Sequence, residues 1–272
     1  MLIFDDGTRA INNNVIENKG NNGMGMMEGS GYIENNGTIQ NTGDNGISVN
    51  GSGYAKNNGT IKNLGDYATS VTSTGIIENN GIIELTGDNK TGMTTTGGGI
   101  SINNGTINVN GANSVGMYAT SSGSTATNAG NIVLNADDTV GMYIDEGAVG
   151  NNSGTISTGV TGLSGVIGVV LGRGATLNNT GTINIDSTNG VGVYLRGGTI
   201  ANYGTITVSG SGSKSVDSMN TTPTTKSVGG VAISAPAGAT TATITANGVI
   251  VTPTVVTTSQ LNQVSVSASS IG

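Results

Sequence analysis

A few tyrosine, arginine and acidic side chains are the residues of this chain that could recognise a ligand. Arg173 and Arg196 are two of its three arginines and lie about one repeat apart. Asp145 and Glu146 lie about one repeat before Arg173. Tyrosine and arginine are the side chains that most often anchor interfaces and stack on sugar rings. The pattern predicts either an ordinary salt-bridged surface or a recognition patch. The candidate ligand-binding residues are Tyr118, Tyr143, Tyr194, Arg173, Arg196, Lys214, Asp217 and Lys226.

Three aspartates form a second candidate site, which could hold a cation. Asp44, Asp66 and Asp88 each follow a Gly at the same place in successive copies of a repeat. Like charges at neighbouring positions repel each other, so two interpretations stand. Either the carboxylates face water or accept hydrogen bonds from backbone amides, or a hard cation such as Ca²⁺ bridges them. The Gly-Gly-x-Gly-x-Asp pattern is missing, which favours the first interpretation and predicts no metal.

The composition removes several other chemistries. The 272 residues include no Cys and no His, so the chain cannot build a disulfide, a thiolate or imidazole metal site, or a Ser-His-Asp triad. With 9 Lys+Arg against 16 Asp+Glu, the formal net charge is −7, and no basic surface for a nucleic-acid backbone is expected. We therefore expect no catalytic residue, no cofactor and no nucleic-acid partner.

A short repeat must position the candidate residues. The string Asn-x-Gly-x-Ile recurs about every 22–27 residues, with Gly at 37, 59, 81, 105, 130, 154, 181 and 204. Gly tolerates the positive φ of a sharp corner, so this column predicts corners. An Asn two places earlier can bond its counterparts in neighbouring repeats through the side-chain amides. The predicted structural ladder contains Asn35, Asn57, Asn79, Asn103, Asn128, Asn152, Asn179 and Asn202.

The segments between these corners are predicted to be short strands with one buried face. A Gly-Met-Tyr motif or a variant of it precedes each Asn-x-Gly-x-Ile string, and apolar residues recur at every second position in both. A unit this short cannot fold alone, so we predict an all-β fold in which the units stack as about 11–12 coils of a right-handed parallel β-helix. The column predicted to face inward contains Met24, Ile47, Thr69, Met93, Met117, Met142, Val169 and Val193.

The repeat divides the chain into four parts. Residues 1–11 are predicted to be a leading segment or partial coil, and residues 12–208 the regular β-helix coils. Residues 209–229 are polar and exceed the length of one coil, which predicts an inserted loop. Residues 230–272 are predicted to form further, less regular coils that are truncated at the C-terminus.

The recurring Asn-Asn-Gly-Thr-Ile string with intervening Gly-Met-Tyr, over residues 12–208, resembles the β-helical passenger of the very large autotransporter (type V secreted) outer-membrane adhesins of fusobacteria. The resemblance implies an extracellular rod on the bacterial surface, anchored at the outer membrane only through a translocator barrel absent from this chain. It also implies adhesion or coaggregation through glycans or protein receptors on host cells or partner bacteria. We expect a monomer, and the resemblance supplies no motif from which binding residues could be transferred.

Three alternative functions remain open. A passive structural stalk would display a binding region located elsewhere in the full-length protein. A polysaccharide-active enzyme on this fold would need clustered carboxylates with a Lys or Arg base, whereas only Asp145 and Glu146 fall near the two later arginines. An ice-binding solenoid would need two threonine columns, whereas the single outward column is interrupted by Ile82 and Asn131. We therefore expect a binding protein that is not an enzyme.

Overall fold

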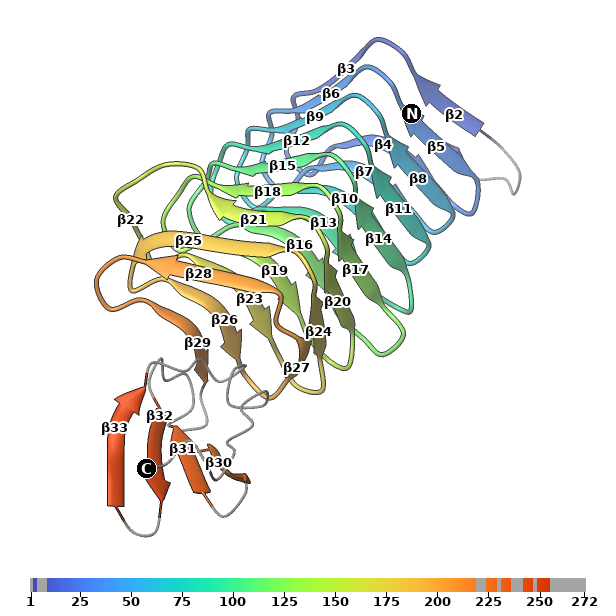
Figure 1. Ribbon diagram of the computed structural model, residues 1–272. Helices are drawn as coiled ribbons and strands as arrows, with labels where there is room; N and C mark the ends of the chain where they lie inside the picture. Colours follow the sequence, from blue (N-terminus) through green and yellow to red (C-terminus); the bar gives the residue numbers. More distant parts are fainter. Residues whose placement is uncertain are drawn as a thin grey trace.

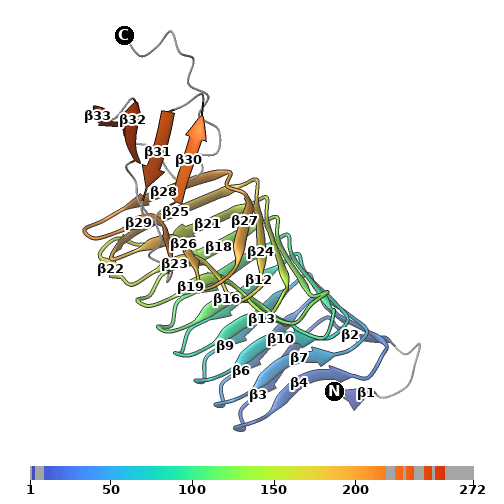
Figure 2. The same ribbon diagram turned by 90° about the horizontal axis from the view of Figure 1, so that it is seen from below.

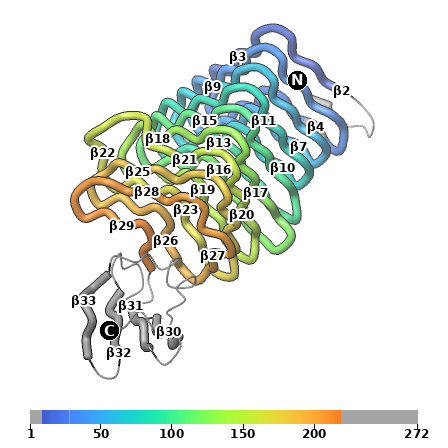
Figure 3. Tube along the Cα trace, viewed as in Figure 1, coloured from blue at the N-terminus to red at the C-terminus, as the bar shows by residue number. Residues whose placement is uncertain are grey.

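The computed structural model describes residues 2–3, 9–218, 224–228, 231–235, 242–246 and 249–254. Within these ranges every regular element is a β-strand, and no helix there is long and apolar enough to cross a membrane. Residues 9–218 wind into about nine stacked turns (Figure 1), and the chain follows a similar path in each of them (Figure 3). The predicted all-β, parallel β-helical fold is confirmed, with fewer turns than predicted.

The turns stack their strands into three parallel sheets, two of which can be followed from below in Figure 2. Sheet A contains β1 (Leu2–Ile3), β4 (Met24–Glu28), β7 (Ile47–Gly51), β10 (Thr69–Ser73), β13 (Thr91–Thr95), β16 (Val115–Ala119), β19 (Val140–Ile144), β23 (Ile167–Leu171), β26 (Val191–Leu195) and β29 (Lys214–Ser218). Sheet B contains β2 (Arg9–Asn12), β5 (Tyr32–Asn35), β8 (Tyr54–Asn57), β11 (Ile76–Asn79), β14 (Ile100–Asn103), β17 (Thr125–Asn128), β20 (Val149–Asn152), β24 (Thr176–Asn179) and β27 (Thr199–Asn202). Sheet C contains β3 (Val15–Asn18), β6 (Thr38–Asn41), β9 (Thr60–Asn63), β12 (Ile82–Leu85), β15 (Thr106–Val109), β18 (Asn131–Leu134), β21 (Thr155–Thr158), β22 (Leu163–Ser164), β25 (Thr182–Thr188) and β28 (Thr205–Ser209).

The glycine column of the repeat is explained by close contact between turns and not by positive φ. A Cβ on Gly59 would lie 2.0 Å from the carbonyl oxygen of Gly37, and a Cβ on Gly81 would lie 2.0 Å from that of Gly59. Positive φ occurs instead at the corner between sheets C and A, for example at Asn45 (φ 55°) and Asn89 (φ 56°), and at the corner between sheets A and B, for example at Gly98 (φ 87°). The prediction that this column marks positive φ is therefore wrong, except at its last member, Gly204 (φ 52°).

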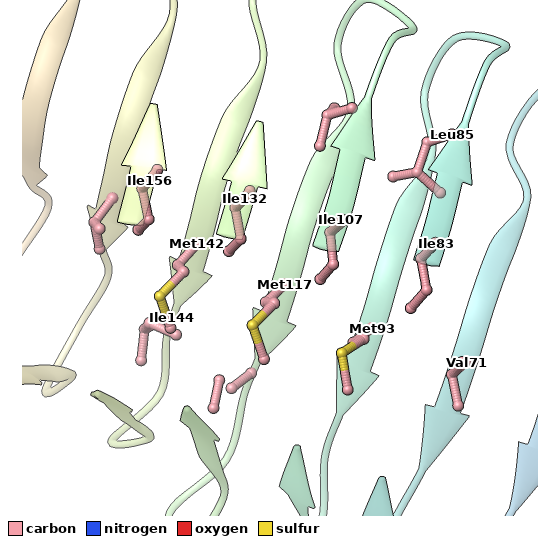
Figure 4. Packing of buried hydrophobic residues seen from close by; sticks show 14 of the residues in the cluster. Val71, Ile83, Leu85, Met93, Ile107, Met117, Ile132, Met142, Ile144 and Ile156 are labelled. Atoms are coloured by element: carbon pink, nitrogen blue, oxygen red, sulfur yellow. The ribbon is translucent and has the colours of Figure 1, made fainter. Parts of the chain in front are cut away.

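The interior is a continuous stack of apolar side chains. Met117 and Met142 of sheet A have an exposed fraction of 0%, and Figure 4 shows them beside Ile107, Ile132 and Ile156 of sheet C. Each inward residue of sheet A pairs with its counterpart one turn away, so the core repeats along the rod. This inward column contains Met26, Val49, Val71, Met93, Met117, Met142, Val169, Val193 and Val216.

The predicted inward column is wrong at its first three members. Met24, Ile47 and Thr69 lie two residues before the inward position, and Met24 is 45% exposed. The reason is that Ser48 and Ser70 stand where later turns have the Gly that precedes the inward residue. The Gly-Met pattern is therefore broken in these two turns. The first turn contains it twice, as Gly23-Met24 and Gly25-Met26, so the sequence does not show which residue faces the core.

The C-terminal part departs from the predicted organisation. The predicted loop over residues 209–229 contains the last residue of β28 and all of β29, which pairs in parallel with β26. The predicted further coils over residues 230–272 are replaced, where the structure describes them, by antiparallel strands. These strands are β31 (Val231–Ala235), β32 (Ala242–Ala246) and β33 (Val249–Thr254). Strand β31 also pairs with β30 (Thr224–Val228), which lies within the predicted loop. Repeated Asn-x-Gly-x-Ile corners are missing there, so neighbouring strands pair as hairpins, and residues 255–272 lie outside the described residues.

Candidate functional site

The outer face of sheet A carries a column of aromatic side chains in its later turns. Tyr118 of β16 pairs in register with Tyr143 of β19; their ring centroids are 5.6 Å apart and the rings are tilted by 59°. The column continues through Val170 of β23 to Tyr194 of β26. All three tyrosines are half-buried, whereas the inward residues beside them are fully buried. The structure therefore places the three predicted tyrosines on one face.

Arg196 joins this aromatic column, whereas the Arg173 side chain forms no hydrogen bond with it. Nη1 of Arg196 donates a hydrogen bond of 3.0 Å to the hydroxyl oxygen of Tyr143. Arg173 is exposed at the preceding corner. Among the described residues neither arginine forms an ion pair with Asp145 or Glu146, so the predicted salt-bridged surface does not form. We call Tyr118, Tyr143, Tyr194 and Arg196 the tyrosine face.

Lys214 and Asp217 extend the same face and are not part of a loop. Asp217 pairs in register with Tyr194, and Lys214 Nζ lies 3.0 Å from the Asp217 carboxylate. The sequence places both residues in the expected insertion because Ser215 replaces the Gly of the strand motif. The side chain of the remaining candidate, Lys226, lies outside the described residues.

The Asn column forms a buried ladder of side-chain amides. In each step the Nδ2 of one Asn donates to the Oδ1 of the next at 2.7–2.8 Å. The ladder runs through Asn12, Asn35, Asn57, Asn79, Asn103, Asn128, Asn152 and Asn179. The prediction fails at Asn202, which is exposed and bonds Asn178 instead, because the β24–β27 register shifts between Leu177 and Asn178. These amides satisfy one another, so the ladder has a structural role.

The aspartate column forms a second ladder, this time with backbone donors. The Asp44 carboxylate accepts the N–H of Asp66 at 2.9 Å, and the Asp66 carboxylate accepts that of Asp88 at 3.0 Å. Lys90 lies nearby with 1% exposure, and its Nζ has no hydrogen-bond partner. Burial lowers the pKa of Lys90, and the carboxylates of Asp66, Asp44 and Asp88 oppose this shift. No group of three His, Cys, Asp or Glu side chains suited to a metal ion occurs among the described residues.

A second aromatic cluster, which was not predicted from the sequence, lies on sheet B. Tyr32 and Tyr54 stack with centroids 5.3 Å apart and an angle of 2°, and the Arg9 guanidinium lies 4.9 Å from the centre of the Tyr32 ring. Arg9 also pairs with Glu34, and this hydrogen bond lowers the pKa of the Glu34 carboxyl. Burial, with a hydrogen bond to Glu78, raises the pKa of Tyr54 to about 12. The available signal was that both tyrosines lie three places before a ladder Asn.

Comparison with known proteins gives one match. Residues 39–154 match the family model described as the BigA third pectate lyase-like domain. No curated protein and no solved structure matches the chain. The matched residues lie entirely within the β-helix, and BigA is an autotransporter-type adhesin. The match therefore supports a relationship between this β-helix and autotransporter-like passengers.

Proposed function

We propose that this chain is a segment of a bacterial cell-surface adhesin and binds a glycan or protein receptor through the tyrosine face. The observation that carries the proposal is the outward pair Tyr118–Tyr143 with the Arg196 guanidinium bonded to it. Aromatic rings offer stacking surfaces, and a guanidinium offers several hydrogen-bond donors. Tyr118 and Tyr143 lie within the residues that match a domain of an adhesin, and Arg196 lies two turns further along the same β-helix.

The proposed location is the outer surface of the cell. The chain would belong to a passenger that is exported by type V secretion and anchored at the outer membrane by a translocator outside this segment. The resemblance of its repeat to the fusobacterial adhesins supports this assignment. Because each turn packs only on its neighbours, a single rod can fold turn by turn as it emerges, and it needs no disulfide.

We propose recognition without catalysis. Hydrolysis or elimination of a polysaccharide requires carboxylates positioned with an acid or base partner. The Asp145 carboxylate accepts the backbone N–H of Glu146 at 2.8 Å, and the Glu146 carboxylate accepts the hydroxyl of Thr120 at 3.1 Å. These two acids are engaged by local donors and have no paired cation among the described residues, which supports a binding role.

The test is the binding of fluorescently labelled chain to epithelial cells and to bacteria, measured by flow cytometry. The double variant Tyr118→Ser/Tyr143→Ser is compared with Thr38→Ser/Thr60→Ser, whose residues pair in register on the outer face of sheet C. We expect the tyrosine variant to lose at least about tenfold in apparent affinity, and the threonine variant to bind normally. Circular dichroism verifies that both variants are folded.

Two results would overturn the proposal. Normal binding by the tyrosine variant would place recognition on another surface of the chain. If no form of the chain binds any cell, the passive stalk is favoured, with the binding region elsewhere in the full-length protein.

A further inference from the structure

A groove lies at the corner where sheet A turns into sheet B, in earlier turns than the tyrosine face. Its volume is about 300 Å³, and its lining residues come from four successive turns. Asn50 and Thr72 occupy outward positions of β7 and β10, whereas Ser52, Thr74 and Thr96 directly follow β7, β10 and β13. The groove therefore runs across turns, along the rod.

The lining of this groove is uncharged, and it combines hydroxyl and amide groups with a larger apolar surface. The side chains of Asn50, Thr72, Thr74 and Thr96 form no hydrogen bond with the other described residues. Ser52 differs, because its hydroxyl donates to the carbonyl of Gly29. No lining residue is acidic or basic. The groove thus presents three hydroxyls and one amide, all with unused capacity to donate and to accept hydrogen bonds.

The backbone at this corner is already paired between turns. Strand β7 pairs with β4 on one side and with β10 on the other. The N–H of Ser52 donates to the carbonyl of Gly29 at 3.1 Å, and that of Thr96 donates to the carbonyl of Ser73 at 3.4 Å. A peptide that binds as an added strand needs a free sheet edge. Recognition in this groove must therefore use side chains.

Side chains of this kind suit a neutral saccharide. Sugar hydroxyls both donate and accept hydrogen bonds, and the C–H faces of sugar rings pack on apolar and aromatic surfaces. Met27 supplies an apolar surface among the lining residues. Towards the C-terminal turns, the outward column of Asn50 and Thr72 continues in register through Thr94 to Tyr118. The groove therefore leads towards the tyrosine face.

We propose that this groove binds an unbranched, neutral oligosaccharide that lies along the rod axis and extends towards Tyr118. Successive turns repeat the contacts at ~4.8 Å, a spacing on the scale of one sugar ring in a linear chain. An anionic chain would find no Lys or Arg among the lining residues. The inference rests on the proposed function, because it names the class of glycan that the rod would recognise.

The experiment is isothermal titration of the 272-residue chain with three neutral probes, maltohexaose, mannohexaose and chitohexaose, and with the anionic probe hexagalacturonate. We expect at least one neutral probe to bind and hexagalacturonate not to bind. The variant Asn50→Leu/Thr72→Val should weaken binding about tenfold or more, because two hydrogen-bonding groups are removed. The control Thr38→Val/Thr60→Val, on sheet C, should bind normally. The inference is overturned if no neutral probe binds, if only hexagalacturonate binds, or if the groove variant binds as tightly as the unaltered chain.

The groove variant in the cell-binding assay separates this inference from the proposed function. If the groove variant binds cells normally and the tyrosine variant does not, the proposed function stands and the groove inference fails. If a neutral probe binds in the groove but the chain binds no cell, the groove inference stands and the proposed function fails.

Discussion

Arg196 Nη1 donates a hydrogen bond of 3.0 Å to the hydroxyl oxygen of Tyr143, although the two residues are 53 positions apart in the sequence. The bond spans the turn that contributes β23, whose outward residue Val170 is only 3% exposed. Because Val170 faces outward and is nevertheless covered, the neighbouring side chains must pack over it. The contact joins side chains of separate turns and fixes an aromatic surface at one place on the rod.

A charge placed in the interior should destabilise the rod. Met117 is 0% exposed, so Met117→Asp buries a carboxylate without a partner and is expected to lower the free energy of unfolding by about 4 kcal/mol or more. Tyr118→Ser changes an outward side chain and should cost about 1 kcal/mol or less. Urea unfolding followed by circular dichroism measures both. Equal destabilisation by the two variants would refute the inward and outward assignment.

The Asn ladder should stabilise the fold only where it is continuous. Asn103 accepts from Asn79 at 2.7 Å and donates to Asn128 at 2.8 Å, so Asn103→Ala removes both bonds and leaves the buried Oδ1 of Asn128 without its ladder donor. We expect a loss of about 2–4 kcal/mol in the free energy of unfolding. The matched control Asn202→Ala, at an exposed position outside the ladder, should be nearly neutral. A similar cost for both substitutions, measured by thermal unfolding, would contradict the role of the ladder.

Tyr54 should titrate above the ordinary pKa of a tyrosine. Burial and the hydrogen bond to Glu78 raise its pKa from 10.0 to about 12. A raised pKa in the folded chain contributes stability that is fully present below pH 10 and is lost as the pH rises from 10 to about 12. Titration of tyrosinate absorbance should show a component near pH 12 that Tyr54→Phe removes. If Tyr54→Phe removes a component near pH 10 instead, the fold does not raise the pKa of Tyr54.

Lys90 should reduce the stability of the fold at neutral pH. Burial lowers its pKa below 10.5 despite the nearby aspartates, so the unfolded chain binds this proton more tightly than the folded chain does. Stability should therefore rise as the pH increases from the folded pKa towards 10.5. Lys90→Met should raise the melting temperature at pH 7 and remove this rise, whereas Lys19→Met, whose side chain is 73% exposed, should change neither. A lower melting temperature for Lys90→Met would show that attraction to the carboxylates outweighs burial.

The sequence predicts the features that depend only on the one-turn period. The stacking of parallel strands and the ladder up to Asn179 follow from the regular spacing of Asn, Gly and Ile. The prediction fails where the register changes locally. At Asn202 a shift between Leu177 and Asn178 moves the side chain out of the ladder, although the motif itself is intact. Spacing in the chain cannot reveal such a shift, because the alternative pairing is decided by packing between turns.

The candidate site was predicted only in part, for a similar reason. The shared column of Tyr118 and Tyr143 follows from the period, since equivalent positions stack. The hydrogen-bond partner of Arg196 does not follow from the period, because a long side chain at a corner can reach several turns. Arg196 bonds Tyr143 rather than Asp145. Strand β29 was not predicted either, because Ser215 stands where the strand motif of other turns has Gly.

Nitration of tyrosines by tetranitromethane, in the free chain and in the chain bound to cells, tests most directly whether the tyrosine face is the recognition surface. Mass spectrometry of the peptides reports the reactivity of each tyrosine. Tyr67, which is 64% exposed at a corner between sheets C and A, provides the internal reference. We expect Tyr118 and Tyr143 to lose reactivity on binding while Tyr67 keeps it. Protection of Tyr67 with unchanged reactivity at Tyr118 and Tyr143 would contradict it.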